Sequence, residues 1–574
     1  MKILGLQERQ AIGRAATAII IIIILVVVGV GAYYVSTSGT TPSPSSTTTA
    51  TTTTSASSTG LASGILSLTF ANVPVADPAK GSDEASSAAL ANLYDSLVFP
   101  TSSGTLQPDL ATSWQVSSDG LTYTFNLRQG VTFHNGDPLT ASDVIFSMNR
   151  LTAMGQGYSY LFAPYIGNVT APNSSTVVIK LKQPFGPFLT ALVRLYVLDQ
   201  KQVTANEVTT GTQYGSNKDY GSTWLLTNDA GSGPYAISSP TNLESEMTLA
   251  AYAHYWNGTL PNQPSTVTMI GSTSSTQALF SSHQIQITDQ WQEYSTVSAL
   301  ANLQGAKLTT IPTVNEFYLM VNTKTAPTDD LYVREAMYYA FNYTAVVDNI
   351  FPGSKPSAGP VPSSLPGHDP NIPVDRQDLT LAKQLIAQSK YAGTLANHPV
   401  QYYWVTQVPA EQKMALQFAS DMQQIGITVN VVGEPWLTVV ADLANLTSSP
   451  NIVSIQDGAS YFEAGSVLQS RYTSASDGTW EQNEWLQNKT LDSLISNALS
   501  TLDQSARFQA YYNIQEQIFH MYPTICAFDV YEVRAYYPSV VNWYAANGHP
   551  IVLLGYDFYF RDFQFYPSQL TALG

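Results

Sequence analysis

The stretch WQVSSDGLTYTFNLRQGVTFHNGDPLTASDVIFSMNRL, residues 114–151, decides the fold. Within it, LTYTFNLRQGVTF alternates apolar and polar residues, a pattern typical of a β-hairpin. NGDP at 135–138 has turn chemistry, because asparagine and glycine tolerate positive φ and proline fixes its own φ. A turn followed by an apolar helical face predicts that the chain enters a helix here.

Two residues mark the start of that helix. Thr140 and Asp143 have the spacing of a capping box, in which the threonine hydroxyl accepts from the backbone N–H of Asp143 and the carboxylate reaches back. The alternative is a metal or acid–base site at His134 and Asp137. Such a site needs more ligands, and the seven histidines include no pair three or four residues apart. We therefore expect a structural turn here, and neither a metal nor a cofactor.

The same stretch resembles the signature of family 5 extracytoplasmic solute-binding proteins, the oligopeptide- and dipeptide-binding proteins of ABC importers. That signature is W-x-V-S-x-D-G, then Y-T-F-x-L-R-x-G-V-x-F-H-x-G, then A-x-D-V. Further segments follow in the family's order: GSGPYAI (231–237), VREAMYYAFNYTAVVDNIFPG (333–353), MALQFASDMQQIGITVNVV (414–432) and LSTLDQSARFQAYYNIQEQIFHMYPTI (499–525). The resemblance covers most of the chain after residue 64.

The resemblance implies an α/β fold, the two-lobed periplasmic-binding-protein fold of the class II type. The first lobe would span 65–313, with an extra subdomain at about 98–215. The second lobe would span 314–533, and 534–574 would return to the first lobe. Strands at TVNEFYLMVN and VYEVRAYY would form the hinge, and ligand would bind between the closing lobes.

Helical stripes support the α/β class independently. One stripe is formed by Met414, Phe418, Met422 and Ile425, and Gly426 occupies a C-cap position before the strand-like ITVNVV. Two further stripes follow, at Leu491, Leu494, Ile495, Ala498, Leu499 and Leu502, and at Phe508, Tyr511, Ile514 and Ile518.

Ligand-binding residues also come from the resemblance. In peptide-binding members, a second-lobe aspartate pairs with the α-amino group of the ligand. The corresponding stretch is IVSIQDGASYFEAG (452–465), which makes Asp457 the candidate and Glu463 the alternative carboxylate. The family's tryptophan before this aspartate is absent here. Asp457 also has a second interpretation, as a turn former before Gly458.

Four aromatic residues lie in segments that face the cleft in the family: Trp291, Phe317, Tyr461 and Tyr531. Aromatic rings stack on peptide side chains and on sugar rings alike. The ligand class therefore stays open between a peptide, which we expect first, and an oligosaccharide.

Composition excludes some functions. The chain has 574 residues with a net charge of −17, from 24 Lys and Arg against 41 Asp and Glu, which disfavours nucleic acid as a partner. Charged residues make up only 11% of the chain, and we hypothesise from this that it is exposed to an acidic medium. One cysteine allows no intrachain disulfide.

The N-terminus predicts a membrane anchor. Residues 1–14 carry positive charge and are expected in the cytoplasm, 15–35 are uncharged and long enough to span a bilayer, and 36–64 form a Ser/Thr-rich linker. The globular body would then lie at the cell surface, on the extracytoplasmic face of the plasma membrane. A removed signal peptide is the alternative. The segment around Gly13 also resembles the prepilin-like leader of archaeal surface binding proteins.

These features predict the substrate-binding component of an ABC transporter, which would require permease and ATPase partners because the chain has no G-x-x-x-x-G-K-[ST] motif. The sequence predicts no enzyme. A surface-anchored glycoside or peptide hydrolase is the alternative of another class, but G-x-S-x-G and H-E-x-x-H are absent. A structural surface or adhesion protein would fit the linker and not the family resemblance.

Overall fold

The computed structural model describes residues 60–208, 214, 217–238, 245–271, 275–374 and 376–573. The expected N-region 1–14, membrane segment 15–35 and most of the linker lie outside these residues. No helix within the described ranges combines the length and apolarity needed to cross a bilayer. The linker prediction extends too far, because the first strand already begins at Ala62, whose N–H donates to the Gln263 carbonyl at 2.8 Å.

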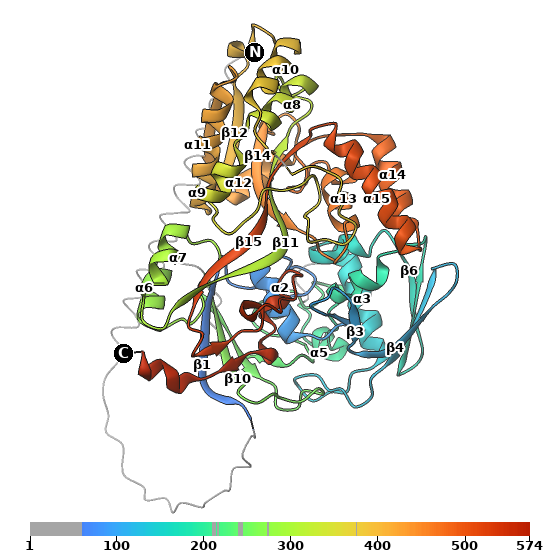
Figure 1. Cartoon of the computed structure of the whole chain (residues 1–574). Coiled ribbons are helices and arrows are strands. Elements are labelled where there is room, and N and C mark those ends of the chain that lie inside the picture. Colours follow the sequence, from blue (N-terminus) through green and yellow to red (C-terminus); the bar gives the residue numbers. More distant parts are fainter. Residues whose placement is uncertain are drawn as a thin grey trace, which may run out of the picture. The chain divides into compact units, whose positions relative to one another are not determined.

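A four-stranded sheet forms the base of the molecule (Figure 1). Its order is β1 (Ala62–Phe70), β10 (Pro264–Gly271), β9 (Glu246–Ala251) and β8 (Tyr235–Ile237). β1 runs parallel to β10, and the other pairs are antiparallel.

A second four-stranded sheet carries the opening stretch. Its order is β4 (Ala111–Val116), β5 (Thr122–Leu127), β7 (Thr176–Leu181) and β6 (Ile166–Asn173), all antiparallel. The predicted hairpin within LTYTFNLRQGVTF is wrong, because β5 pairs with β4 and β7. Asp119 explains the difference, since it accepts from the Ser117 hydroxyl at 2.5 Å and the Leu121 N–H at 3.0 Å and makes the turn before β5 instead.

The third sheet is the largest and joins the two ends of the molecule. Its order is β13 (Val429–Glu434), β12 (Val400–Val405), β14 (Ile452–Gly458), β11 (Lys307–Val321) and β15 (Thr524–Tyr536). β12 is parallel to both its neighbours, as the predicted αβ unit requires, whereas β11 is antiparallel to β14 and β15. Figure 1 shows β11 and β15 side by side, running from the upper part of the view into the lower part.

The helices follow the apolar stripes. α11 (Pro409–Gln423) buries Met414, Phe418 and Met422, and Gly426 has a φ of 83° just beyond it. Leu502 departs from the prediction, because it lies past the end of its helix and is 41% exposed.

The remaining elements are β2 (Val98–Pro100), β3 (Leu106–Pro108), β16 (Val541–Asn542), β17 (Gln564–Phe565), α2 (Glu84–Leu93), α3 (Ala141–Met154), α4 (Phe188–Ala191), α5 (Gln200–Ala205), α6 (Thr276–Ser281), α7 (Tyr294–Leu300), α8 (Leu331–Ala340), α9 (Tyr343–Asn349), α10 (Leu379–Gln388), α12 (Trp436–Leu443), α13 (Gly465–Tyr472), α14 (Lys489–Ser500) and α15 (Gln504–Phe519), with short 3₁₀ turns between them.

Two large hydrophobic cores result. The first contains β1, α2, the extra sheet and the C-terminal segment, whose Trp543 and Phe558 are fully buried there. The second surrounds β12 with α8 and α11. α13, α14 and α15 pack into the first core, through residues such as Leu468 and Tyr511. The segment expected as the second lobe, 314–533, therefore contributes to both cores.

Candidate ligand site between the two cores

The opening stretch is structural. The predicted capping box is present, and the Asp143 carboxylate accepts the Thr140 N–H at 2.8 Å. His134 Nδ1 pairs with Asp229, and its Nε2 contacts the Gly233 carbonyl at 3.0 Å. Burial opposes the charged imidazole, yet Asp229, the Gly233 carbonyl and Asp95 together outweigh burial and raise the pKa of His134. The histidine thereby ties this turn to the GSGPYAI segment.

The central sheet separates the candidate residues, because successive side chains of a strand point to opposite faces. Glu316 on β11 lies opposite Asp457 on β14, and Phe317 lies opposite Gln456. Glu316 and Asp457 therefore share one face, and Phe317 and Gln456 share the other.

Asp457 faces a buried arginine on α13. Its Oδ2 lies 3.9 Å from Arg471 Nε, and neither atom has a hydrogen-bond partner. Arg471 donates to Glu316 Oε2 at 2.6 Å and to the Asp457 carbonyl at 3.0 Å, and its guanidinium lies 3.8 Å from the Tyr318 ring. We call these four residues the Asp457 site: Glu316, Tyr318, Asp457 and Arg471.

The Asp457 site holds more acid than base. Burial raises the pKa of Asp457, and Arg471 opposes that shift. Burial, reinforced by the Asp457 charge, raises the pKa of nearby Glu481 to about 8, and burial raises that of Glu316 to about 7. Arg471 thus serves three carboxyl groups, and Glu316 and Glu481 hold protons near neutral pH unless a further cation favours their ionised forms.

Residues of the first core close over the loop that follows Asp457. The Tyr160 hydroxyl bonds to the Ser460 hydroxyl, and Arg194 Nε donates to the Ser460 carbonyl at 2.9 Å. The Asp457 site therefore lies where two parts of the chain, far apart in sequence, meet.

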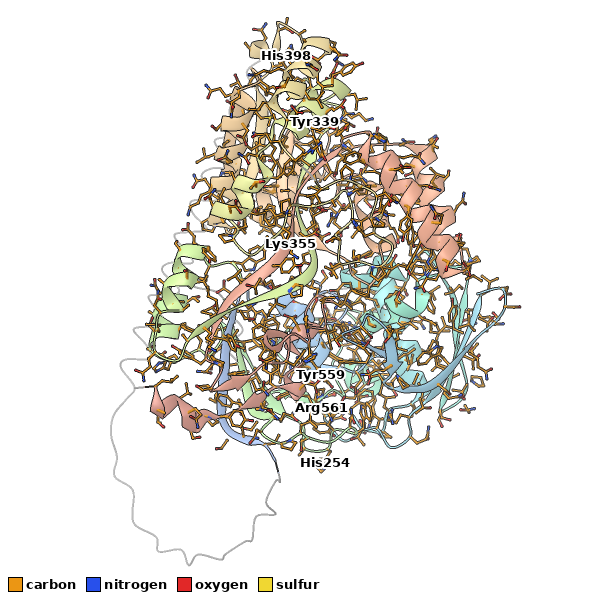
Figure 2. All side chains as sticks on the ribbon, viewed as in Figure 1. His254, Tyr339, Lys355, His398, Tyr559 and Arg561 are labelled. Carbon is orange, nitrogen blue, oxygen red and sulfur yellow. The ribbon has the colours of Figure 1, made fainter. Side chains whose placement is uncertain are left out.

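A pocket opens on the other side of the sheet. The volume of this cavity is about 60 Å³, and its lining includes Trp291, Gln456 and Tyr531. The indole Nε1 of Trp291 is buried without a partner. Lys355 Nζ lies 5.1 Å from the Tyr531 ring centroid, midway between the upper and lower parts of the view in Figure 2. Two of the predicted aromatic residues, Trp291 and Tyr531, thus line this pocket, which lies on the opposite face of the sheet from the Asp457 side chain.

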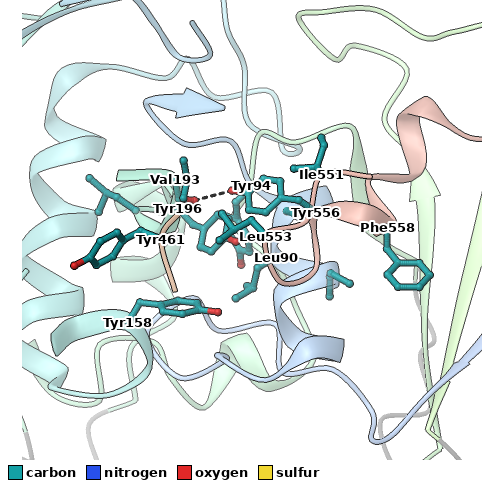
Figure 3. Packing of buried hydrophobic residues seen from close by; sticks show 14 of the residues in the cluster. Leu90, Tyr94, Tyr158, Val193, Tyr196, Tyr461, Ile551, Leu553, Tyr556 and Phe558 are labelled. Carbon is teal, nitrogen blue, oxygen red and sulfur yellow. Dashed lines mark hydrogen bonds between the residues drawn. The ribbon is translucent and has the colours of Figure 1, made fainter. Parts of the chain in front are cut away.

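The other three predicted residues are packed inside the protein. Phe317 is fully buried and stacks on Phe528 with ring centroids 5.2 Å apart. Tyr461 is fully buried in the first core (Figure 3). Glu463 accepts from Arg507 at 2.7 and 2.9 Å and from the Tyr511 hydroxyl at 2.7 Å, so its carboxylate is fully engaged.

Sequence reasoning missed Glu316, Arg471, Glu481, Tyr160 and Arg194. Arg471 is 155 residues from Glu316, and Arg194 is 266 residues from Ser460, so no local spacing connects them. The one available signal was the scarcity of lysine and arginine, 24 in 574 residues, which makes each arginine in an apolar segment notable.

Comparison with known proteins identifies the family. Residues 105–479 match the model described as bacterial extracellular solute-binding proteins, family 5 middle. The chain is 27% identical over 421 residues to the probable D,D-dipeptide-binding periplasmic protein of Escherichia coli, covering 72% of this chain and 77% of that one. It is 25% identical over 462 residues to the glutathione-binding protein of the same species, covering 79% and 86%.

Solved structures share the fold. The Helicobacter pylori periplasmic binding protein in complex with the peptide STSA has a TM-score of 0.74 at 22% identity, covering 88% of this chain and 98% of that one. Haemophilus influenzae OppA in complex with RPPGFSPFR has a TM-score of 0.69 at 20% identity, covering 87% of this chain and 98% of that one. These neighbours are two-lobed α/β periplasmic binding proteins, which confirms the two-lobed α/β fold expected from the sequence. The chain belongs to family 5 of the extracellular solute-binding proteins, the substrate-binding components of ABC transporters.

Proposed function

We propose that the chain captures peptides and delivers them to an ABC permease, with the Asp457 site holding the ligand's α-amino group. The supporting observation is that the buried Asp457 Oδ2 accepts no hydrogen bond, although Arg471 Nε lies 3.9 Å away. A buried acceptor without a partner is costly, and an ammonium group supplies three donors and a positive charge. The named ligands of several relatives, a dipeptide and glutathione among them, agree with this ligand class.

The proposal assigns a ligand contact to Asp457 among the six candidate residues. Asp457 binds the amino group, while Trp291 and Tyr531 line a separate pocket on the opposite face of the sheet, which a short peptide held at Asp457 does not reach. Phe317, Tyr461 and Glu463 have packing roles in this proposal, because their rings and carboxylate are already engaged.

We also propose that residues 15–35 anchor the protein at the cell surface, with 36–61 as a tether of the archaeal type. The support is the uncharged run after Arg14 and the Ser/Thr-rich segment that follows it. In this proposal the N-terminus faces the cytoplasm and the binding lobes face outwards. Fractionation of cells that produce the full chain, followed by protease treatment of intact cells, would check it.

Native mass spectrometry tests the ligand class. The protein is incubated with pooled libraries of peptides of two to five residues and of oligosaccharides. Intact peptide captured at one equivalent is the expected result. Capture of sugars alone would contradict the peptide assignment, and cleaved products would indicate a hydrolase.

Asp457→Asn tests the residue assignment. Loss of the charge opposite the ligand ammonium should weaken peptide binding about a hundredfold, as measured by isothermal titration calorimetry. Asp378→Asn is the matched control, because Asp378 caps α10 and asparagine caps as well. Equal affinities for the wild type and Asp457→Asn would rule Asp457 out as the amino-group partner.

A further inference from the structure

Six asparagines of the chain begin an N-x-S/T sequon, the motif at which oligosaccharides are attached to the side-chain amide of extracellular proteins. They are Asn168, Asn173, Asn257, Asn342, Asn445 and Asn488. A chain rich in serine and threonine contains such motifs by chance, so the fold has to distinguish among them. Because the chain belongs to an extracellular family, an asparagine that the fold leaves open is a candidate acceptor.

Two of the six asparagines are used by helices. Asn342 Oδ1 accepts a backbone N–H at 3.0 Å at the start of α9. Asn488 Oδ1 accepts two backbone N–H groups at 3.1 and 3.2 Å at the start of α14, and its Nδ2 donates to Met521 Sδ at 3.8 Å. A sugar needs open space around Nδ2, and both of these side chains are half-buried and held as helix caps. The fold therefore disfavours a glycan at either position.

Two of the exposed asparagines lie on one strand, β6. Asn168 and Thr170 are exposed, whereas Val169 between them is 7% exposed. Because successive side chains of a strand point to opposite faces, the asparagine and the threonine of this sequon share the outer face. Asn173 is the last residue of β6 and is exposed as well, and its Oδ1 accepts the N–H of Ser175 at 2.9 Å and the hydroxyl at 3.0 Å. Both bonds use the amide oxygen and leave Nδ2, the atom that would carry the sugar, open.

β6 is also an edge of its sheet. The order β4, β5, β7, β6 gives it a neighbouring strand on one side only within the described chain, and Figure 1 labels it at the right margin of the molecule. An unpaired edge can add a strand from another chain, and proteins commonly prevent this with charged side chains on the edge. The sequence of β6, IGNVTAPN, has no charged residue, and its Pro172 removes only one N–H. A bulky hydrophilic group on this strand would supply the missing protection.

We propose that Asn168 and Asn173 carry N-linked glycans, which cover the free edge of β6. The donor is an oligosaccharide linked through phosphate to a polyprenyl lipid. Nδ2 of the asparagine forms a bond to the anomeric carbon of the first sugar, and the bond from that carbon to the phosphate oxygen breaks. The proton lost from Nδ2 leaves with the lipid phosphate, so the transfer needs neither an oxidant nor a reductant. The attached chains are bulky and solubilising.

Peptide mapping tests the two sites directly. The full chain is purified from the organism that encodes it, and its proteolytic peptides are analysed by tandem mass spectrometry. Glycans are expected on Asn168 and Asn173 and not on Asn342 or Asn488. Unmodified Asn168 and Asn173 would overturn the proposal, and this result requires no variant to fold.

Variants of the third sequon residue test each attachment. Thr170→Ala and Ser175→Ala should each lower the mass of the intact protein by one glycan, whereas Thr170→Ser and Ser175→Thr keep the sequons and should keep both glycans. Thr490→Ala is the matched control, because it removes the sequon of Asn488 and leaves the backbone N–H that the cap uses. Its mass should change by the substitution alone.

Light scattering tests the role at the edge. The double variant Thr170→Ala/Ser175→Ala exposes β6 and should self-associate at concentrations at which the wild type does not. Melting curves establish that the variants are folded. A folded double variant that lacks both glycans and associates no more than the wild type would overturn the protective role.

Discussion

Glu411 shows how one buried carboxyl group gives the protein a preference for acid. It is buried at the start of α11, and its Oε2 accepts from the Val405 N–H at 2.8 Å and the Ser454 hydroxyl at 3.2 Å. Burial raises the pKa of Glu411 to about 8 from its ordinary value of 4.5, although both donors oppose the shift. Between these two pH values the folded state holds a proton that the unfolded state has lost.

The free energy of unfolding should therefore fall as pH rises from 4.5 to 8, and Glu411→Gln should remove this contribution. Relative to wild type, the variant should gain stability by about 1.4 kcal/mol for each pH unit in that window, and the gain should level off above it. Urea unfolding at pH 5 and pH 8 measures the difference. The same offset from wild type at both pH values would contradict the assignment.

At the scale of elements, α3 offers a clean test of its first turn. Thr140→Ala removes the hydroxyl of the capping box and should lower the free energy of unfolding by about 1 kcal/mol, while Thr140→Ser should retain most of it. Thr152→Ala is the control on the same helix, because Thr152 lies in its last turn, far from the capping box, and alanine is the better helix former. Urea titrations of the three variants make the comparison, and equal losses in both alanine variants would contradict the cap.

Elements whose periodicity is local were predictable from the sequence. The stripe in α11 and the turn into α3 depend on neighbours a few residues away, and both are present. The failed hairpin had the right periodicity but the wrong partner, because the Asp119 turn competes with the later one. The candidate site could not be predicted in this way, because Asp457 was identified from the family resemblance and not from local periodicity. The atoms that give it chemistry belong to Arg471 and Glu481, which only tertiary packing brings near.

At the scale of the whole molecule, the buried carboxyl groups act together. Burial raises the pKa of Glu84, Glu411, Glu481 and Glu484 to about 8, of Glu316 to about 7 and of Asp95 to about 6. All six hold protons in the folded state that the unfolded chain releases at lower pH. The melting temperature should therefore be higher at pH 5 than at pH 8, and differential scanning calorimetry across this range checks the sign.

Acid would still destabilise the protein at low enough pH. Lys201 donates to Asp137 at 2.9 and 3.0 Å and lowers its pKa, so this surface pair is lost as pH falls through that lowered value. The stability maximum should then lie near pH 4 to 5, which agrees with the hypothesis of an acidic medium drawn from the 11% charged residues. A maximum at neutral pH would contradict both.

Cys526, the chain's one cysteine, is 4% exposed on β15. Thiol-reactive dyes reach such a side chain slowly. The wild-type protein should therefore take up little dye before any other cysteine is introduced. Cysteines introduced at the exposed Lys180 and Lys383, on β7 and α10, would accept a donor and an acceptor fluorophore without further engineering. Energy transfer between single dye pairs would then follow opening and closing directly in molecules of otherwise unaltered sequence.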